Sequence, residues 1–157
     1  VAHAASETAD IFKTTEQGLG DKLGTIMFSD GPDGLVITTD LKGLPKGERG
    51  FHIHEFPSCE PTNKDGKITP AGAAGGHWDP NKTGKHTGPG AGGHMGDLPI
   101  LKVADDGTAK LTLHAKGLKA EDVKNHSIMI HAGGDNFSDQ PEPLGGGGAR
   151  FACGVIK

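Results

Sequence analysis

The sequence of 157 residues has no apolar run that approaches the length of a membrane-spanning helix. It also has no excess of positive charge, because its formal net charge is −4. This charge argues against general affinity for nucleic acid or for an anionic membrane, and any anionic ligand must be attracted by a local positive field. We therefore expect no membrane span and no nucleic-acid partner.

Helical patterns are scarce, since only residues 119–125 could form a single short helical turn. Short apolar or alternating runs dominate instead, and 27 glycines with 10 prolines favour many turns over long helices. Turn sequences such as DGPDG and DDGT separate several of these runs. The pattern predicts an all-β barrel or sandwich whose strands lie within residues 9–15, 23–29, 34–41, 49–55, 100–104, 109–114, 126–131 and 150–156.

The length of the chain fits one domain, because 157 residues can enclose one sizeable core but not two comfortable ones. No internal repeat and no linker divides the sequence. We therefore interpret residues 1–157 as a single domain, in which residues 1–8 form a flexible N-terminal segment.

Two stretches, residues 57–99 and 132–149, do not fit a compact β domain, because they are rich in Gly, Pro and Asn and show little periodicity. Loops of this length are usually functional or disordered. The first stretch contains ligand-capable and aromatic side chains that are atypical of a solvated linker, namely His77, Trp78, His86, His94, Met95 and Asp97. We expect a bound group to order this loop.

Cysteine is rare, with only Cys59 and Cys153, which fall in opposite halves of the chain. A free buried pair fits a cytosolic protein, and a disulfide fits an exported one. Residues Ala2-His3-Ala4 have the small-x-small form of a signal-peptidase site, but no apolar segment precedes them. We expect an exported chain from which a leader has been removed.

The sequence FHIHE at residues 51–55 places two histidines on one side of a predicted strand. Side chains alternate between the faces of an extended chain, so His52 and His54 point one way while Phe51 and Ile53 point the other way. Two imidazoles therefore project together from one rigid element.

Six of the nine histidines form a pattern with an aspartate, Asp97. A lone histidine is more often a surface or core residue than a ligand, but this set favours metal binding. Imidazole suits both copper and zinc, and three histidines with one aspartate in tetrahedral geometry suit zinc best. The six residues supply enough ligands for two metals: His52, His54, His77, His86, His94 and His131.

Six motifs resemble those of the copper/zinc superoxide dismutases, in particular the bacterial periplasmic branch: GFHIHE, AGGHWDP, KTGKH, GHMGDLP, MIHAGGDN and LGGGGARFACGVI. The resemblance covers nearly the whole chain from the second strand onward. It implies an all-β fold, an eight-stranded Greek-key β-barrel of the immunoglobulin-like sandwich type with two long functional loops. It also implies an antioxidant enzyme that converts superoxide to dioxygen and hydrogen peroxide, with one copper and one zinc per chain.

The resemblance implies a role for each matching residue. The copper ligands are His52, His54, His77 and His131, and the zinc ligands are His77, His86, His94 and Asp97. His77 bridges the metals, and it releases copper and takes a proton when copper is reduced. Asp135 links a zinc ligand to a copper ligand, and Arg150 stands over the copper and holds the anionic substrate.

The remaining implications concern the surroundings of the site. Cys59 and Cys153 match the disulfide of the family, and the insert TNKDGK makes Lys64 and Lys67 candidates for steering the substrate. The same resemblance implies a periplasmic enzyme whose small-molecule substrate is superoxide, and a homodimer is a possible assembly.

Two other functions compete with this interpretation. A non-enzymatic copper or zinc buffering protein on the same scaffold would need the metal ligands but not Arg150, so this arginine favours the enzyme. An adhesion module with metals in its loops would not explain six histidines.

Overall fold

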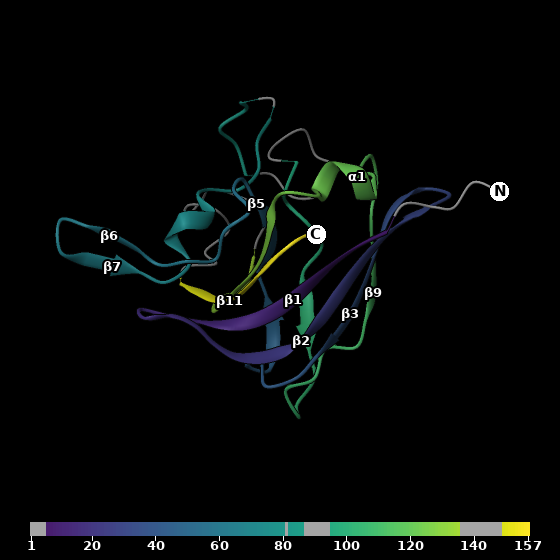
Figure 1. Ribbon diagram of the computed structural model, residues 1–157. Helices are drawn as coiled ribbons and strands as arrows, with labels where there is room; N and C mark the ends of the chain where they lie inside the picture. The colour runs from purple at the N-terminus through teal and green to yellow at the C-terminus, as the bar shows by residue number, and fades with distance from the viewer. Residues whose placement is uncertain (1–5, 81, 87–94, 136–148) are drawn as a thin grey trace.

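The computed structural model describes residues 6–80, 82–86, 95–135 and 149–157. An antiparallel seven-stranded sheet with the order β5-β10-β11-β1-β2-β3-β9 curls around the core (Figure 1). Its strands are β1 (Ser6–Thr15), β2 (Gly18–Gly31), β3 (Gly34–Leu41), β5 (Phe51–His54), β9 (Thr112–Ala115), β10 (Ser127–His131) and β11 (Arg150–Val155).

Two short strand pairs complete the β-structure. Strand β4 (Gly47–Arg49) pairs with β8 (Leu101–Val103). Strands β6 (Thr62–Lys64) and β7 (Lys67–Thr69) form a hairpin that extends away from the sheet (Figure 1). A 3₁₀ turn, η1 (Gly72–Ala74), lies between β7 and β8, and one short helix, α1 (Ala120–Val123), lies between β9 and β10. Within the described part of the chain, no helix is long and apolar enough to cross a membrane.

The all-β prediction is confirmed, and each of the eight predicted runs overlaps a strand. The structure differs in three details. β1 begins at Ser6, so it includes the end of the segment expected to be flexible, and the β6–β7 hairpin lies within the first long loop. The run at 49–55 is divided at Gly50, where an added Cβ would come within 3.2 Å of the Gly134 carbonyl. The backbone at Gly50 bonds Gly133 and His131 instead of continuing one strand.

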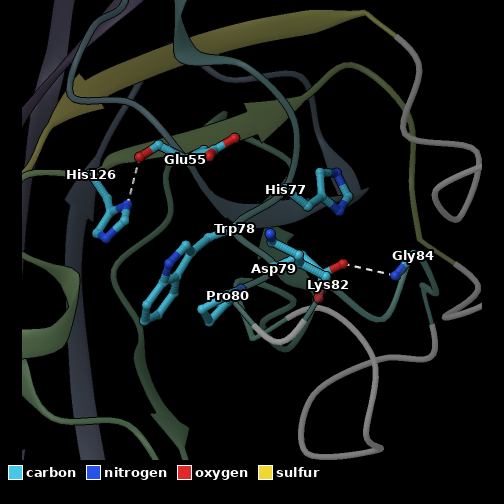
Figure 2. Close-up of a pocket in the computed structure, with 8 residues that line it drawn as sticks. All are labelled: Glu55, His77, Trp78, Asp79, Pro80, Lys82, Gly84 and His126. Carbon is cyan, nitrogen blue, oxygen red and sulfur yellow. Dashed lines mark hydrogen bonds between the residues drawn. The ribbon is translucent and has the colours of Figure 1, made fainter.

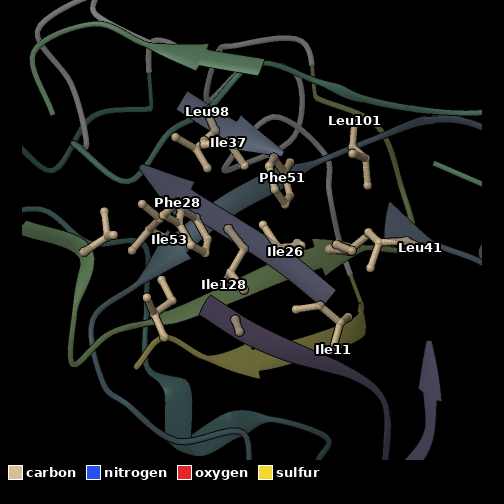
Figure 3. Close-up of a cluster of buried hydrophobic side chains, with 14 of the residues drawn as sticks. Ile11, Ile26, Phe28, Ile37, Leu41, Phe51, Ile53, Leu98, Leu101 and Ile128 are labelled. Carbon is tan, nitrogen blue, oxygen red and sulfur yellow. The ribbon is translucent and has the colours of Figure 1, made fainter. Parts of the chain in front are cut away.

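The core is built by side-chain alternation on neighbouring strands. Ile26 and Phe28 on β2 and Ile37 on β3 are fully buried, and they pack with Phe51 and Ile53 of β5 (Figure 3). Burying an aliphatic or aromatic side chain of this size contributes about 1.5–3 kcal/mol. Phe51 and Ile53, predicted to share one face of their strand, thus both face the core.

Strands β5 and β10 are buried on both faces. In the antiparallel register, Met129 lies opposite His52 and Ser127 lies opposite His54. Since residues opposite each other share a face, Met129 and Ser127 lie on the same side as the two histidines, away from the core residue Ile53. The first long loop covers this second face, so a metal site can form between the loop and the two strands.

A disulfide joins Cys59 in the first long loop to Cys153 on β11, with the sulfur atoms 2.07 Å apart. The bond settles the choice that the two cysteines left open. Cys59 and Cys153 pack with Met129 in a small cluster separate from the main core, together with Ala71 and Ala74. The loop that covers the histidine face is thus tied covalently to the sheet.

Replacing Cys59 and Cys153 together by alanine should lower the free energy of unfolding. The disulfide closes a loop with a sequence separation of 94 residues, which corresponds to about 4–5 kcal/mol in the chain-entropy treatment. Urea unfolding of the metal-free variant and wild type would measure the difference, with chemically reduced wild type as the control. A change below about 1 kcal/mol would show that the loop is held in place without the bond.

Candidate metal centre

Four buried histidines from separate parts of the chain converge on the outer face of β5 and β10. Their ligand nitrogens lie within 4.8 Å of one another, and the members are His52, His54, His77 and His131. The first loop is held against β5 by backbone bonding, because the Trp78 N–H donates to the Ile53 carbonyl at 2.8 Å. This contact brings the preceding residue, His77, opposite His54.

A second cluster shares two of these histidines and adds ligands from later in the loop. Its members are His52, His77, His86 and Asp97, also within 4.8 Å of one another. Gly96 permits this approach: its carbonyl accepts from Ile53 N–H at 2.8 Å, and an added Cβ would lie 2.2 Å from the Ile53 carbonyl oxygen. Only glycine fits here, and it delivers Asp97 to the strand. His94, expected in this cluster, lies outside the described residues.

Two carboxylates connect the imidazoles of both clusters. Asp135 accepts from His52 Nε2 and from His86 Nε2, each at 2.7 Å. Asp97 accepts from His77 Nδ1 at 2.9 Å, and its other oxygen lies 2.7 Å from His86 Nδ1. Asp135 thus contacts His52, which belongs to both clusters, and His86, which belongs to the second one.

The donor set fits metal ions that prefer nitrogen ligands. His54 Nδ1 donates to the Gly75 carbonyl at 2.9 Å, and His52 Nε2 is bonded to Asp135, so His54 Nε2 and His52 Nδ1 remain. Both of these atoms are buried and have no hydrogen-bond partner among the described residues. An unsatisfied buried polar atom is costly, and a coordinated metal would satisfy both nitrogens.

Arg150, at the start of β11, is held beside the histidines by backbone oxygens. Its Nη1 donates to the Ala71 carbonyl at 2.7 Å and its Nη2 to the Gly75 carbonyl at 2.5 Å. The hydroxyl of Thr14 donates to the Arg150 carbonyl at 2.5 Å and so anchors its backbone. Gly75 therefore supports both His54 and Arg150.

The sequence interpretation missed Gly75, Ala71 and Thr14. Two of them act through main-chain carbonyls, which leave no side-chain pattern in the sequence. The glycine pair that precedes His77 is the one available signal, since Gly75 adopts φ of 75° and an added Cβ would lie 2.7 Å from the ring of Phe56.

The candidate steering lysines lie on the β6–β7 hairpin, where Lys64 pairs with Lys67. Lys67 is exposed. The hairpin stands apart from the barrel (Figure 1), so a lysine there would act on a substrate through its long-range field.

The carboxylates divide the histidines into charged and neutral ones. Burial lowers the pKa of His86, but its bonds to Asp135 and Asp97 and their negative charges outweigh burial and raise this pKa to about 9. Burial raises the pKa of Asp97, but hydrogen bonds from His77 and His86 outweigh it and lower this pKa to about 2. For His77, burial prevails over the bond from Asp97 and lowers the pKa to about 4. Without metal at neutral pH, His86 is thus an imidazolium between two carboxylates.

A sequence model of the family described as copper/zinc superoxide dismutase matches residues 22–156. The chain belongs to the copper/zinc superoxide dismutase family. It is 55% identical to superoxide dismutase [Cu-Zn] 2 of Salmonella typhimurium over 157 residues, 99% of this chain and 91% of the relative. The resemblance drawn from the motifs is confirmed.

Two solved structures agree with this assignment. The copper/zinc superoxide dismutase from Brucella abortus superposes with a TM-score of 0.95 and 51% identity, over 98% of this chain and 100% of that one. The monomeric enzyme from Salmonella enterica, determined in solution, gives a TM-score of 0.87 and 54% identity over the same shares. As a member of this family, the protein dismutes superoxide to dioxygen and hydrogen peroxide and uses copper and zinc.

In the metal-free superoxide dismutase, His86 should titrate near pH 9 and His77 near pH 4. Because the folded-state pKa of His86 is raised above the ordinary 6.5, the stability from its proton is complete below about pH 6.5 and is lost as the pH rises through 9. NMR titration of the ring nitrogens would measure both values. Asp135→Asn, which removes one carboxylate charge, should lower the pKa of His86. A His86 midpoint at its ordinary value in wild type would refute the ion-pair arrangement.

Proposed function

We propose that His52, His54, His77 and His131 hold copper, and that His77, His86, His94 and Asp97 hold zinc. The observation that carries this proposal is that the two buried clusters share His52 and His77. Asp135 engages Nε2 of His52 and leaves that ring one free nitrogen, so the bridging ligand is His77. Its Nδ1 faces Asp97, which leaves Nε2 on the opposite edge of the ring for the other metal. For His94 the support is the motif GHMGDLP alone.

When bound, copper supplies the one-electron oxidation and reduction that superoxide dismutation requires. His52 would bind it through Nδ1 and His54 through Nε2, because Asp135 and the Gly75 carbonyl engage the other nitrogens. These bonds fix each ring in the tautomer and orientation that a ligand needs. The rigid strand β5 thus offers two oriented donors before any metal arrives.

The zinc cluster contains a carboxylate, Asp97, which the copper cluster lacks. His86 carries a proton at neutral pH, and zinc would have to displace it. Asp97 contributes a carboxylate oxygen, and Asp135 retains His86 through Nε2, so Nδ1 becomes the ligand. Three imidazoles with one carboxylate match the preference of zinc. Asp135 acts on both halves without touching either metal.

Arg150 holds the substrate. The net charge of −4 repels superoxide from the molecule as a whole, so a local positive group has to attract it. The guanidinium has five N–H donors in a fixed fork, and two nitrogens are already anchored by Ala71 and Gly75. The remaining donors can bind an oxygen of the anion beside His54 by charge-assisted hydrogen bonds.

One proton of hydrogen peroxide comes from His77 Nε2 in this proposal. This atom lies at the junction of the clusters, and the His77 side chain is nearly buried, so a proton held there is delivered to the site and not exchanged freely with bulk water. With zinc bound in place of the Nδ1 hydrogen bond to Asp97, the ring would stay oriented while Nε2 gains and loses the proton.

We also propose a periplasmic location. The Cys59–Cys153 disulfide supports it, since such bonds persist in oxidising compartments. The homodimer considered from the sequence stays a prediction. The Salmonella enterica relative is described as monomeric, and sedimentation of this chain would distinguish the two states.

Metal analysis and superoxide consumption on one remetallated sample test the ligand assignment and the enzymatic role together. Wild type should contain comparable copper and zinc and consume superoxide. His131→Ala should lose copper preferentially, His86→Ala should lose zinc preferentially, and His114→Ala, an exposed histidine outside both clusters, should keep both metals. A single metal in wild type would refute the two-site assignment, and two metals without superoxide consumption would favour a metal store.

The role of Arg150 can be separated from long-range steering by ionic strength. Arg150→Glu should slow catalysis at all salt concentrations with both metals retained, because the contact with superoxide is short. Lys67→Glu should slow it mainly in dilute buffer, since the Debye length is about 30 Å at 0.01 M salt and about 8 Å at 0.15 M. Pulse radiolysis would measure both rates. Lys116→Glu, an exposed change of equal charge beyond β9, is the control. Unchanged catalysis in Arg150→Glu would remove the arginine from the mechanism.

A further inference from the structure

The chain between His77 and His86 turns around one carboxylate, that of Asp79. Its Oδ1 accepts from the Thr83 N–H at 3.1 Å and from the Thr83 hydroxyl at 3.0 Å. Its Oδ2 accepts from the Gly84 N–H at 2.8 Å (Figure 2). The side chain of Asp79 thus accepts three hydrogen bonds from the segment that leads to His86.

The backbone of this turn adopts conformations that need such support. Lys82 has φ of 52°, in the left-handed region that non-glycine residues rarely adopt, and Gly84 has φ of 64°. The Lys82 N–H also donates to the Asp79 carbonyl at 3.0 Å. An unsupported chain would leave this geometry for the extended or right-handed region.

Packing contributes little on one side of the turn. Asp79, Lys82 and Gly84 line an open cavity of about 620 Å³, with Trp78 and Pro80 on its wall (Figure 2). Among the described residues, none of the fully buried core side chains lines this cavity, and hydrogen bonds to Asp79 support the turn on this side.

The turn begins after Trp78, whose backbone is held by hydrogen bonds, and leads to His86, a proposed zinc ligand. Trp78 is bonded to β5 through its N–H, and its carbonyl accepts from Gly96 N–H at 2.9 Å. Asp79 follows directly. At the other end, His86 lies between Asp97 and Asp135. The carboxylate of Asp79 therefore controls how the chain spans from His77 to His86.

We propose that Asp79 is a positioning residue. It holds the turn between His77 and His86 in its zinc-binding conformation before zinc binds. The inference rests on the proposed function, in which His77 and His86 are zinc ligands. Ordering a loop when the metal binds consumes binding free energy, and a turn formed beforehand lowers that loss. Asp79 would thus raise zinc affinity without touching zinc.

The test compares zinc affinity and amide exchange in Asp79→Ala, Asp79→Asn and wild type. Trp78 is the only tryptophan and the chain has no tyrosine, so fluorescence comes from a residue adjacent to His77 and can follow zinc binding against a chelator. Asp79→Ala should weaken zinc by about 10–100-fold, as loss of a residue that orients ligands does. Asp79→Asn keeps one acceptor and should lose less. In metal-free protein, the Thr83 and Gly84 amides should exchange faster in Asp79→Ala than in wild type.

A matched control lies in the turn between β8 and β9. Asp106 accepts from the N–H and hydroxyl of Thr108 at 3.1 and 2.7 Å, a similar pair of donors at a residue outside both histidine clusters. Asp106→Ala should leave zinc affinity unchanged. Thr83→Val removes one donor of the turn but no charge near the site, and it should weaken zinc in the same direction as Asp79→Ala.

The outcomes separate this inference from the ligand assignment. Equal zinc affinity in Asp79→Ala and wild type, with zinc still lost in His86→Ala, would overturn the positioning role alone. Unprotected Thr83 and Gly84 amides in metal-free wild type would also overturn it, because the turn would then form only with zinc. Zinc binding that does not depend on His86 would instead refute the proposed function. If Asp79→Ala does not fold, Asp79→Asn and Thr83→Val decide, and unchanged affinity in both overturns the inference.

Discussion

The metal centre depends on how the edge strand β5 satisfies its backbone. β5 lies at one end of the seven-stranded sheet, and β10 pairs with only one of its edges. The other edge is bonded by the first long loop, since the Ile53 N–H donates to Gly96 and the Ile53 carbonyl accepts from Trp78. An open edge would bind water or another chain. Because these two loop residues adjoin Asp97 and His77, closing the edge also delivers both side chains to His52 and His54.

Charge imposes the second condition on the centre. Several imidazoles packed out of water could not all be protonated, because burial and mutual repulsion oppose the charged form. Asp97 and Asp135 resolve this by holding one proton at His86, while burial keeps His77 and His54 neutral. His54 and His77 can thereby bind a metal without first losing a proton, whereas a metal that binds His86 must displace one. The same carboxylates orient the rings, so protonation and geometry are coupled.

Much of this organisation could be predicted from the sequence, because it is carried by side-chain patterns. Alternation predicted that Phe51 and Ile53 face the core and the histidines face outward, and turn residues separated the eight strand runs. The break at Gly50 and the shared carbonyl of Gly75 could not be predicted, since each depends on main-chain groups that contact residues far apart in sequence. The two cysteines left their pairing open, because composition does not reveal whether their Cα atoms lie at the 5.8 Å found here.

The 3₁₀ turn η1 links the disulfide to the catalytic face. Its residues Gly72–Ala74 follow Cys59 in the first long loop and directly precede Gly75. Ala74 packs with Met129 and the two cysteines. The carbonyl of Gly75 accepts from both His54 and Arg150, so one backbone oxygen sets the distance between the imidazole proposed to bind copper and the guanidinium proposed to attract superoxide. A shift of this turn would move both groups together. The covalent tie at Cys59 therefore supports catalytic geometry as well as stability, because it holds the segment that carries this shared acceptor.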